Sequence, residues 1–332
     1  MDKQPTSYPK EKVNILFLEN ISDAAVKQFK DAGYTSVRKL SGALSEEQLI
    51  KEIKDVHLLG IRSKTQITAK ILEAAPKLQA IGCFCIGVNQ VDLKTATQQG
   101  VVVFNAPYSN TRSVAELVIA LSIMLIRRIP DKNKAAHEGI WKKEAKGSYE
   151  LRGKTLGIFG MGKIGFELAK RSVAAFGMKI IYHNRSRHPE AEKELKATLV
   201  SFGELLEKSD VLSVNTALTP ETKGRFNKEV FARMKRTSIF INAARGAIHQ
   251  EAELQDALEK GVIWGAGLDV TNPEPMRSDH PLLTMPNVCI LPHIGSATEE
   301  TRAAMALIAA KNVVAGLSGQ RLPYIVNPEI YL

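Results

Sequence analysis

The sequence predicts an α/β protein made of two parallel-sheet domains with a cleft between them. The chain has 332 residues, which is more than one hydrophobic core of ordinary size requires. Short apolar runs alternate with segments of helical length, which is the pattern of parallel strands joined by helices. This alternation occurs twice, once before residue 108 and again from residue 152. We therefore expect two sheets rather than one.

The first series begins with a buried strand at residues 13–20 and an amphipathic helix at 22–33. Another helix is expected after Ser45, because Ser45 followed by Gln48 is a capping-box pattern. Further short strands are predicted at residues 57–63, 78–85 and 101–107. A long apolar helix at residues 113–128 follows; its most apolar stretch is about half the length needed to span a bilayer, so we expect it to be buried in protein.

The second series contains six predicted strands, the number that a complete dinucleotide-binding sheet needs. They are expected at residues 155–160, 178–184, 211–216, 238–244, 263–270 and 288–294. A last helix at 298–317 is long enough to return to the first domain. We therefore predict a discontinuous first domain, residues 1–108 with 296–332, and a second domain at 109–295 that includes the long apolar helix.

Composition narrows the class of protein and its partners. Hydrophobic residues make up 44% and charged residues 24%, as in soluble globular proteins. The polar segment 1–12 lacks the apolar stretch of a signal peptide, and the three cysteines lack zinc-site spacing, so we expect a cytoplasmic protein with buried thiols and no metal. The net charge of +10 favours anionic partners. Because the basic residues are dispersed, small phosphorylated molecules fit better than nucleic acid, and no membrane contact is expected.

A glycine motif predicts the cofactor. Gly160, Gly162 and Gly165 form a GxGxxG pattern directly after a predicted strand, and Lys163 and Ile164 open the helix that follows. Glycines let the backbone approach a pyrophosphate, and the helix N-terminus offers N–H groups and a positive dipole end. In this context we interpret the motif as a dinucleotide-binding site.

Residues at the end of the next strand predict which dinucleotide is preferred. An NAD site usually has an acidic residue there to bind the ribose hydroxyls. Asn184 occupies that position, so no carboxylate would repel a 2′-phosphate, and Arg185, Ser186 and Arg187 follow. The arginines offer charge-assisted hydrogen bonds to such a phosphate. NADP(H) is therefore the expected cofactor and NAD(H) a second option; the alternative interpretation is a solvated basic turn.

Three polar residues after strands of the second series are the catalytic candidates. Arg245 and Glu274 each follow a predicted strand and His293 lies at the end of another, at the sheet edge where open α/β sheets bind ligands. Arg245 would hold a substrate carboxylate, and Glu274 would favour the protonated form of His293. His293 would then exchange a proton with the substrate oxygen as hydride is transferred. Further cofactor contacts are expected from neighbouring residues, namely Ala243, Ala244, Asp269 and Gly295.

The remaining histidines lack such a setting. Most of the six are expected at the surface, and none pairs with cysteine or aspartate at metal-ligand spacing: His57, His137, His183, His188, His249 and His280.

The motifs together resemble the D-isomer-specific 2-hydroxyacid dehydrogenases over nearly the whole chain. The order GMGKIG, INAARG, GLDVTNPEP and LPHIGSAT carries the resemblance. It implies two Rossmann-like domains, a flavodoxin-like substrate-binding domain and a dinucleotide-binding domain, acting on a small anionic 2-hydroxy or 2-keto acid. It also implies a homodimer built around the long helix after FNAPYSN, or a tetramer of such dimers.

Before the domain boundary the chain looks like the D-3-phosphoglycerate dehydrogenase branch. The segments GIRSKT, IGCFCIGVNQVDL and FNAPYSNTRSVAELVIA carry this likeness. It implies that backbone amides of Ile86-Gly87-Val88 hold the carboxylate, that Asn110 contacts the substrate, and that basic residues surround the phosphate. The implied phosphate region contains Arg62, Ser63, Lys64 and Lys143. Lys64 stands where that branch often has arginine, and Ser41 where it often has lysine.

From about residue 152 the chain looks instead like glyoxylate/hydroxypyruvate reductase, an NADPH-using branch. The segments YHNRSR, TPETKGRFNKEVFARMK and GAGLDVTNPEPMRSDHPLL carry this likeness, and Trp141 matches a residue that reaches a neighbouring subunit's active site. A domain-swapped chimera, natural or engineered, is therefore one hypothesis. The expected function is an NADP(H)-preferring D-3-phosphoglycerate dehydrogenase of serine biosynthesis. The alternatives are a glyoxylate/hydroxypyruvate reductase and, more remotely, a non-enzymatic dinucleotide-sensing corepressor.

Overall fold

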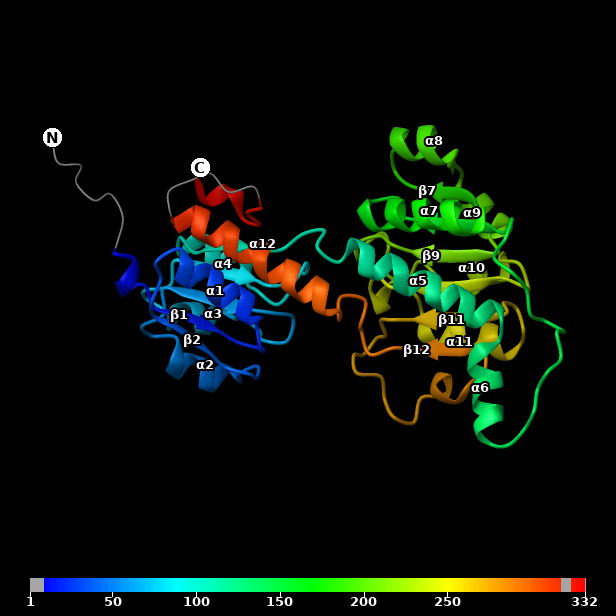
Figure 1. Cartoon of the computed structure of the whole chain (residues 1–332), viewed down its shortest axis with the longest axis horizontal. Coiled ribbons are helices and arrows are strands. Elements are labelled where there is room, and N and C mark those ends of the chain that lie inside the picture. The colour runs from blue at the N-terminus through cyan, green and yellow to red at the C-terminus, as the bar shows by residue number, and fades with distance from the viewer. Residues whose placement is uncertain (1–8, 318–323, 332) are drawn as a thin grey trace. The chain divides into compact units, whose positions relative to one another are not determined.

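The computed structural model describes residues 9–317 and 324–331, and it divides into two compact units (Figure 1). Unit 1 comprises residues 1–110 and 299–332, and unit 2 comprises 111–298. The boundaries expected from the sequence, after 108 and after 295, lie two and three residues earlier. Most of the polar N-terminal segment, residues 1–8, lies outside the described residues.

Unit 1 has a five-stranded parallel sheet in the order β2-β1-β3-β4-β5. The strands are β1 (Ile15–Phe17), β2 (Val37–Lys39), β3 (Leu58–Ile61), β4 (Ala80–Cys83) and β5 (Val102–Phe104). This is the flavodoxin-like order. The sequence did not predict β2, because two of its three residues are basic and it lies at the edge of the sheet, only partly buried. The other four strands confirm the predicted segments.

Helices cover the sheet of unit 1, and apolar side chains fill the space between them. The helices are α1 (Asp23–Asp31), α2 (Glu46–Glu52), α3 (Ala69–Glu73), α4 (Leu93–Gln98) and α12 (Glu299–Leu317), with short 3-10 helices at Lys10–Lys12 and Pro328–Tyr331. Ser45 caps α2 with the predicted capping box. Phe17 of β1 packs edge-on against Phe29 and Phe84, each with ring centroids 5.3 Å away. Helix α12 returns from residue 299 to pack beside α1 in this unit (Figure 1).

Unit 2 has a seven-stranded parallel sheet in the order β12-β11-β10-β9-β6-β7-β8. The strands are β6 (Thr155–Phe159), β7 (Lys179–His183), β8 (Thr198–Leu199), β9 (Val211–Val214), β10 (Ile239–Asn242), β11 (Gly265–Leu268) and β12 (Val288–Ile290). Outward from β6, this is the doubly wound order of dinucleotide-binding sheets. The expectation of six strands was one short: β8 is a two-residue edge strand, too short to show periodicity.

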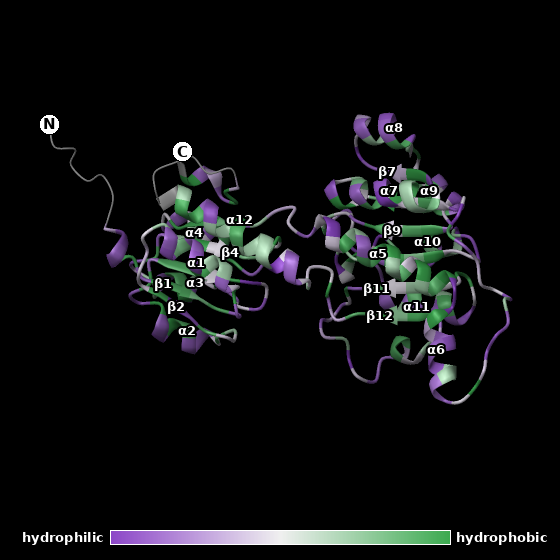
Figure 2. Cartoon of the chain, in the orientation of Figure 1, coloured by the Kyte–Doolittle hydropathy of each residue, from purple (hydrophilic) through white to green (hydrophobic). Residues whose placement is uncertain are grey.

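The helices of unit 2 cover both faces of its sheet. They are α5 (Thr111–Ile126), α6 (Ile129–His137), α7 (Lys163–Phe176), α8 (Pro189–Leu195), α9 (Phe202–Lys208), α10 (Lys228–Ala232) and α11 (Glu251–Glu259), with 3-10 helices at Gly246–Ile248 and Pro281–Thr284. Figure 2 shows apolar strands between helices of mixed polarity. Helix α5 buries Val118 and Leu121 and packs on α7, β10 and β11, as its apolar sequence predicted. Within residues 9–317 and 324–331, no helix has the length and apolar character to cross a membrane.

The histidines depart from the surface placement that was expected. Of the six outside the catalytic candidates, His137 is exposed, whereas His57 and His249 are buried and the others are half-buried. The cysteines are free thiols; Cys83 is buried and the other two are half-buried. Burial raises the pKa of Cys83 well above its usual value, so this thiol is a packing group rather than a nucleophile.

Candidate active site

His293 and Glu274 form a hydrogen-bonded pair beyond the carboxyl ends of β12 and β11. Nδ1 of His293 lies 3.0 Å from Oε2 of Glu274, and the other carboxylate oxygen accepts a hydrogen bond from the Thr271 N–H at 3.2 Å. The bond to Glu274 raises the pKa of His293 despite the opposing effect of burial. Burial alone would raise the pKa of Glu274. The hydrogen bond to His293 and the charge of that ring outweigh burial, so the pKa of Glu274 is lowered. The pair therefore favours a charged imidazolium beside a carboxylate.

Asp269 holds the loop that carries His293. Its side chain is buried, and its two oxygens accept hydrogen bonds from the N–H groups of Ile294 (2.7 Å) and Gly295 (2.8 Å). Burial raises the pKa of Asp269, while these two N–H donors oppose the rise. His293 itself has a φ of +54°, a conformation that costs a non-glycine residue energy unless its neighbours hold it. The cofactor contacts expected of Asp269 and Gly295 stay a prediction; in the structure the two residues hold the backbone next to His293.

Arg245 follows β10 in a turn that buried polar side chains organise. Asn242 ends the strand; its Oδ1 accepts from the Ala244 N–H at 2.9 Å, and its Nδ2 donates to the Arg245 carbonyl at 2.9 Å. Nδ2 also lies 3.0 Å from Nδ1 of His249. Burial lowers the pKa of His249 to about 4, so its ring is neutral and Nδ1 is free to accept. Sequence reasoning missed both residues; an asparagine ending an apolar strand was the available signal.

The glycine loop fits a dinucleotide. Gly162 is the N-cap of α7 and has no side chain with which to cap the helix. A Cβ added there would meet no atom within 4 Å. The opening of α7 at Lys163 and Ile164 therefore has space in front of it, as a bound pyrophosphate needs. Gly160 has a φ of +103°, and a Cβ there would lie 2.8 Å from the Thr216 nitrogen. Gly165 lets α7 approach the loop, because a Cβ there would lie 2.6 Å from the Gly160 carbonyl oxygen.

The residues after β7 are only partly arranged as expected. Asn184 is tied to the glycine loop, because its side chain accepts from the Met161 N–H at 2.6 Å and donates to the Met161 carbonyl at 3.2 Å. Arg187 forms a bidentate ion pair with Glu192, which brings Nη2 within 2.7 Å of the carboxylate. Arg185 and Ser186 are exposed, and in the described part of the chain Arg185 forms no ion pair. Arg185 is therefore the arginine that is available here.

The predicted carboxylate loop presents unpaired backbone donors. Ile86, Gly87 and Val88 follow β4 and are half-buried. None of their N–H groups donates a hydrogen bond to another described residue. Consecutive unpaired N–H groups in a loop form a concavity that binds anions. The segment therefore has the donors that a substrate carboxylate requires.

Two buried residues that sequence reasoning missed tie this loop to the basic segment after β3. Glu19 is 7% exposed, and its carboxylate accepts from the N–H groups of Arg62 (3.1 Å), Lys64 (3.0 Å) and Thr65 (2.9 Å). Gln90 is 3% exposed, and its Nε2 donates to the carbonyls of Arg62 (2.9 Å) and Gly87 (3.2 Å). The segment of Arg62 to Lys64 and the loop 86–88, both predicted to bind substrate, are therefore held together by buried hydrogen bonds in unit 1.

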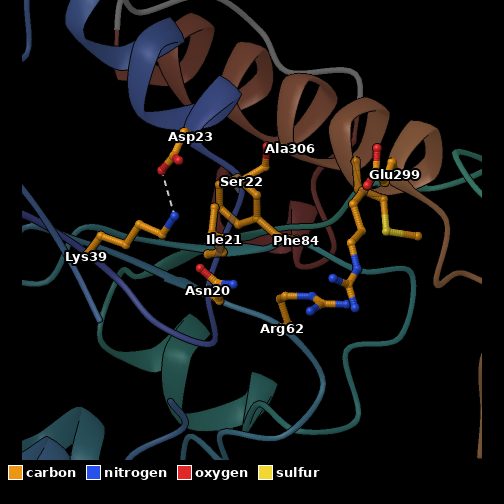
Figure 3. Close-up of a pocket in the computed structure, with 11 residues that line it drawn as sticks. Asn20, Ile21, Ser22, Asp23, Lys39, Arg62, Phe84, Glu299 and Ala306 are labelled. Carbon is orange, nitrogen blue, oxygen red and sulfur yellow. Dashed lines mark hydrogen bonds and ion pairs between the residues drawn. The ribbon is translucent and has the colours of Figure 1, made fainter. Parts of the chain in front are cut away.

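The other predicted substrate residues occupy different settings. Asn110 is buried at the end of unit 1, whereas Ser63 and Lys64 are exposed. Trp141 is 85% exposed, and Lys143 is exposed in the same segment of unit 2. Arg62 lines a pocket of about 350 Å³ in unit 1 (Figure 3). Among residues 9–317 and 324–331, no three His, Cys, Asp or Glu side chains gather as metal ligands would.

Comparisons with known proteins agree with this geometry. Residues 119–295 match the family model described as D-isomer specific 2-hydroxyacid dehydrogenase, NAD binding domain. A D-3-phosphoglycerate dehydrogenase of Dictyostelium discoideum is 42% identical over 333 residues, which cover 98% of this chain and 81% of the relative. Among solved structures, a glyoxylate reductase from Paecilomyes thermophila has a TM-score of 0.83 at 31% identity, over 96% of this chain and 99% of that one. An NADPH-dependent glyoxylate/hydroxypyruvate reductase from Sinorhizobium meliloti has a TM-score of 0.81 at 29% identity, over 95% and 99%.

Proposed function

The chain belongs to the D-isomer-specific 2-hydroxyacid dehydrogenase family, and on that premise we propose that it is an NADP(H)-preferring D-3-phosphoglycerate dehydrogenase. Its reaction class is the nicotinamide-dependent interconversion of a 2-hydroxy acid and a 2-keto acid. The identity of the acid and the preference for the phosphorylated cofactor are the proposed parts. Glyoxylate or hydroxypyruvate is the second candidate for the keto acid.

We infer the catalytic roles from the geometry of unit 2. When bound, the nicotinamide supplies or accepts the hydride. Arg245 orients the substrate by pairing its guanidinium with the carboxylate. His293, held protonated by Glu274, donates a proton to the keto oxygen in the reductive direction and accepts it in the oxidative direction. Replacing His293 by alanine should reduce turnover by about 10²–10⁴-fold while the variant still binds NADPH.

The main support for a phosphorylated substrate is the position of Arg62. This residue lines a pocket in the same unit as the unpaired amides of residues 86–88. In the described part of the chain, its guanidinium has no carboxylate within ion-pair distance, so its charge is available to a ligand. Glu19 and Gln90 hold the backbone of Arg62 and of the amide loop together, which suits a small acid with an anionic group at each end. The 42% identity to a D-3-phosphoglycerate dehydrogenase supports the same choice.

The cofactor proposal rests on Asn184 and Arg185. Asn184 carries no charge to repel a 2′-phosphate, and Arg185 is an exposed arginine without an ion-pair partner among the described residues. Arg187 would first have to leave its bidentate ion pair with Glu192, so it is the less available of the two arginines. We assign the main contact to Arg185 and a secondary one to Arg187.

A substrate panel run with both cofactors tests the proposal. Phosphohydroxypyruvate, hydroxypyruvate and glyoxylate are each assayed with NADPH and with NADH. The proposal predicts the highest kcat/KM for phosphohydroxypyruvate with NADPH. An equal or higher kcat/KM for glyoxylate would reject the substrate, and a preference for NADH would reject the cofactor, each independently of the other.

The alternative, glyoxylate/hydroxypyruvate reductase, is favoured by the likeness to two solved reductases. Comparing residues 1–151 and 152–332 separately with known proteins would test the chimera hypothesis, which fails if both parts have the same nearest relatives. The homodimer and the cytoplasmic location stay predictions. The exposed apolar side chains of Ile129, Ile140, Trp141 and Tyr149 favour an interface at that segment. A corepressor-like protein would bind NADPH without turning over any acid in the panel.

A further inference from the structure

We propose that Arg302, at the start of α12, forms with Arg62 the binding site for the substrate's phosphate. This inference rests on the proposed function and assigns a specificity-determining residue to it. Neither the motifs nor the likeness to known proteins singled out Arg302. The observation behind it is a pocket of about 350 Å³ in unit 1, lined by both arginines (Figure 3).

The pocket lies beyond the carboxyl ends of the unit 1 strands. Its walls come from the segment after β1, from Arg62 after β3, from Phe84 after β4 and from the first turns of α12. Ligands of open parallel sheets bind beyond this edge. The volume lies at the lower end of the range for small-molecule sites, which suits a metabolite of three carbons and a phosphate.

The charges around the pocket favour an anion. Lys39 is neutralised by Asp23, whose carboxylate lies 2.6 Å from the ammonium group. Arg62 and Arg302 have no carboxylate within ion-pair distance among residues 9–317 and 324–331. Glu299 also lines the pocket but forms no ion pair with either arginine. Two guanidinium groups around one small volume repel each other, and an anion placed between them converts that repulsion into two attractions.

Buried contacts hold the backbone segments that carry the two arginines. The N–H of Arg62 is bonded to buried Glu19, and its carbonyl accepts from buried Gln90. Arg302 precedes Met305 and Ala306 by three and four residues on α12, and both are buried in the core of unit 1. The two side chains therefore leave rigid elements, which reduces the ordering cost of binding. A planar guanidinium can give two parallel N–H bonds to phosphate oxygens, so two of them suit a phosphate monoester better than a single carboxylate.

The test compares substrates that differ by the phosphate alone. Wild-type enzyme and the Arg302→Gln, Arg302→Lys and Lys311→Gln variants are assayed with phosphohydroxypyruvate and hydroxypyruvate. Lys311 is the matched control, because it is exposed on α12 and does not line the pocket. Inorganic phosphate is titrated as an inhibitor of hydroxypyruvate reduction in each protein, and thermal unfolding checks that each variant is folded.

We expect Arg302→Gln to lower the ratio of kcat/KM for phosphohydroxypyruvate over hydroxypyruvate by about 10- to 100-fold, the loss of one charge-assisted contact. Inhibition by inorganic phosphate should weaken in parallel, Arg302→Lys should recover part of both effects, and Lys311→Gln should change neither. An unchanged ratio, or an equal loss on both substrates, would overturn the assignment. If the wild type prefers glyoxylate in the substrate panel, the proposed function fails. Weaker inhibition of Arg302→Gln than of wild type by inorganic phosphate would still support the anion site, and equal inhibition of the two proteins would overturn it.

Discussion

Buried His249 makes the stability of unit 2 depend on pH. Its side chain is 3% exposed, its Nδ1 lies 3.0 Å from the Asn242 amide, and burial lowers its pKa to about 4. Its Nε2 has no hydrogen-bond partner among the described residues, so protonation would bury an uncompensated charge. An unfolded histidine has a pKa of about 6.5. The folded state therefore excludes a proton that the unfolded state accepts.

The size of the effect follows from the two pKa values. The neutral histidine costs no stability above about pH 6.5, and stability is lost as pH falls from there toward about 4. The full difference corresponds to about 3 kcal/mol, of which about 2 kcal/mol is lost by pH 5. The free energy of unfolding of an ordinary domain is about 5–15 kcal/mol, so a loss of this size is a large fraction of it.

Urea unfolding followed by tryptophan fluorescence isolates this effect, because Trp141 and Trp264 both lie in unit 2. The free energy of unfolding is compared at pH 7.5 and pH 5 for wild type, His249→Gln and His137→Gln. Glutamine at 249 keeps an acceptor for Asn242 but does not titrate, and His137 is an exposed control in the same unit. His249→Gln should lose about 2 kcal/mol less than wild type between the two pH values, and His137→Gln should follow wild type. Equal losses in wild type and His249→Gln would refute the reasoning.

Three further changes probe the site. Glu274→Gln removes the carboxylate that raises the pKa of His293, so the alkaline limb of the kcat/KM profile for reduction should move to lower pH. A limb that does not move would mean that Glu274 does not set the pKa of the group that titrates in this profile. Glu19→Gln leaves fewer acceptors for three backbone N–H groups, of which that of Thr65 is buried, at a cost of about 1–3 kcal/mol. It should raise KM for the keto acid more than it lowers kcat, and a loss in kcat alone would contradict its positioning role. Asn184→Asp should weaken NADPH and strengthen NADH, measured as the ratio of their KM values; a variant that still prefers NADPH would mean that the arginines dominate.

Local sequence patterns predicted most of the architecture and singled out the candidate catalytic residues. Apolar runs predicted all but two strands. β2 and β8 were missed because they are short edge strands without an apolar run, and none of their residues is fully buried. The glycine motif works through spacing along one strand, one turn and one helix, so it is legible without a structure. Arg245, Glu274 and His293 were predicted as catalytic candidates because parallel strands place their carboxyl ends at one edge.

Only the tertiary structure decided how these residues are held. Glu19 meets the segment after β3 across 43 to 46 residues of sequence, and Asp269 meets the His293 loop across 25 and 26. Contacts of that range have no periodicity, because packing and not chain spacing brings the partners together. The same reason hid the place of Arg302 beside Arg62. The sequence by itself determined which chemical groups lie at the sheet edges; folding determined which of them are braced, which are already paired and which are left to bind a ligand.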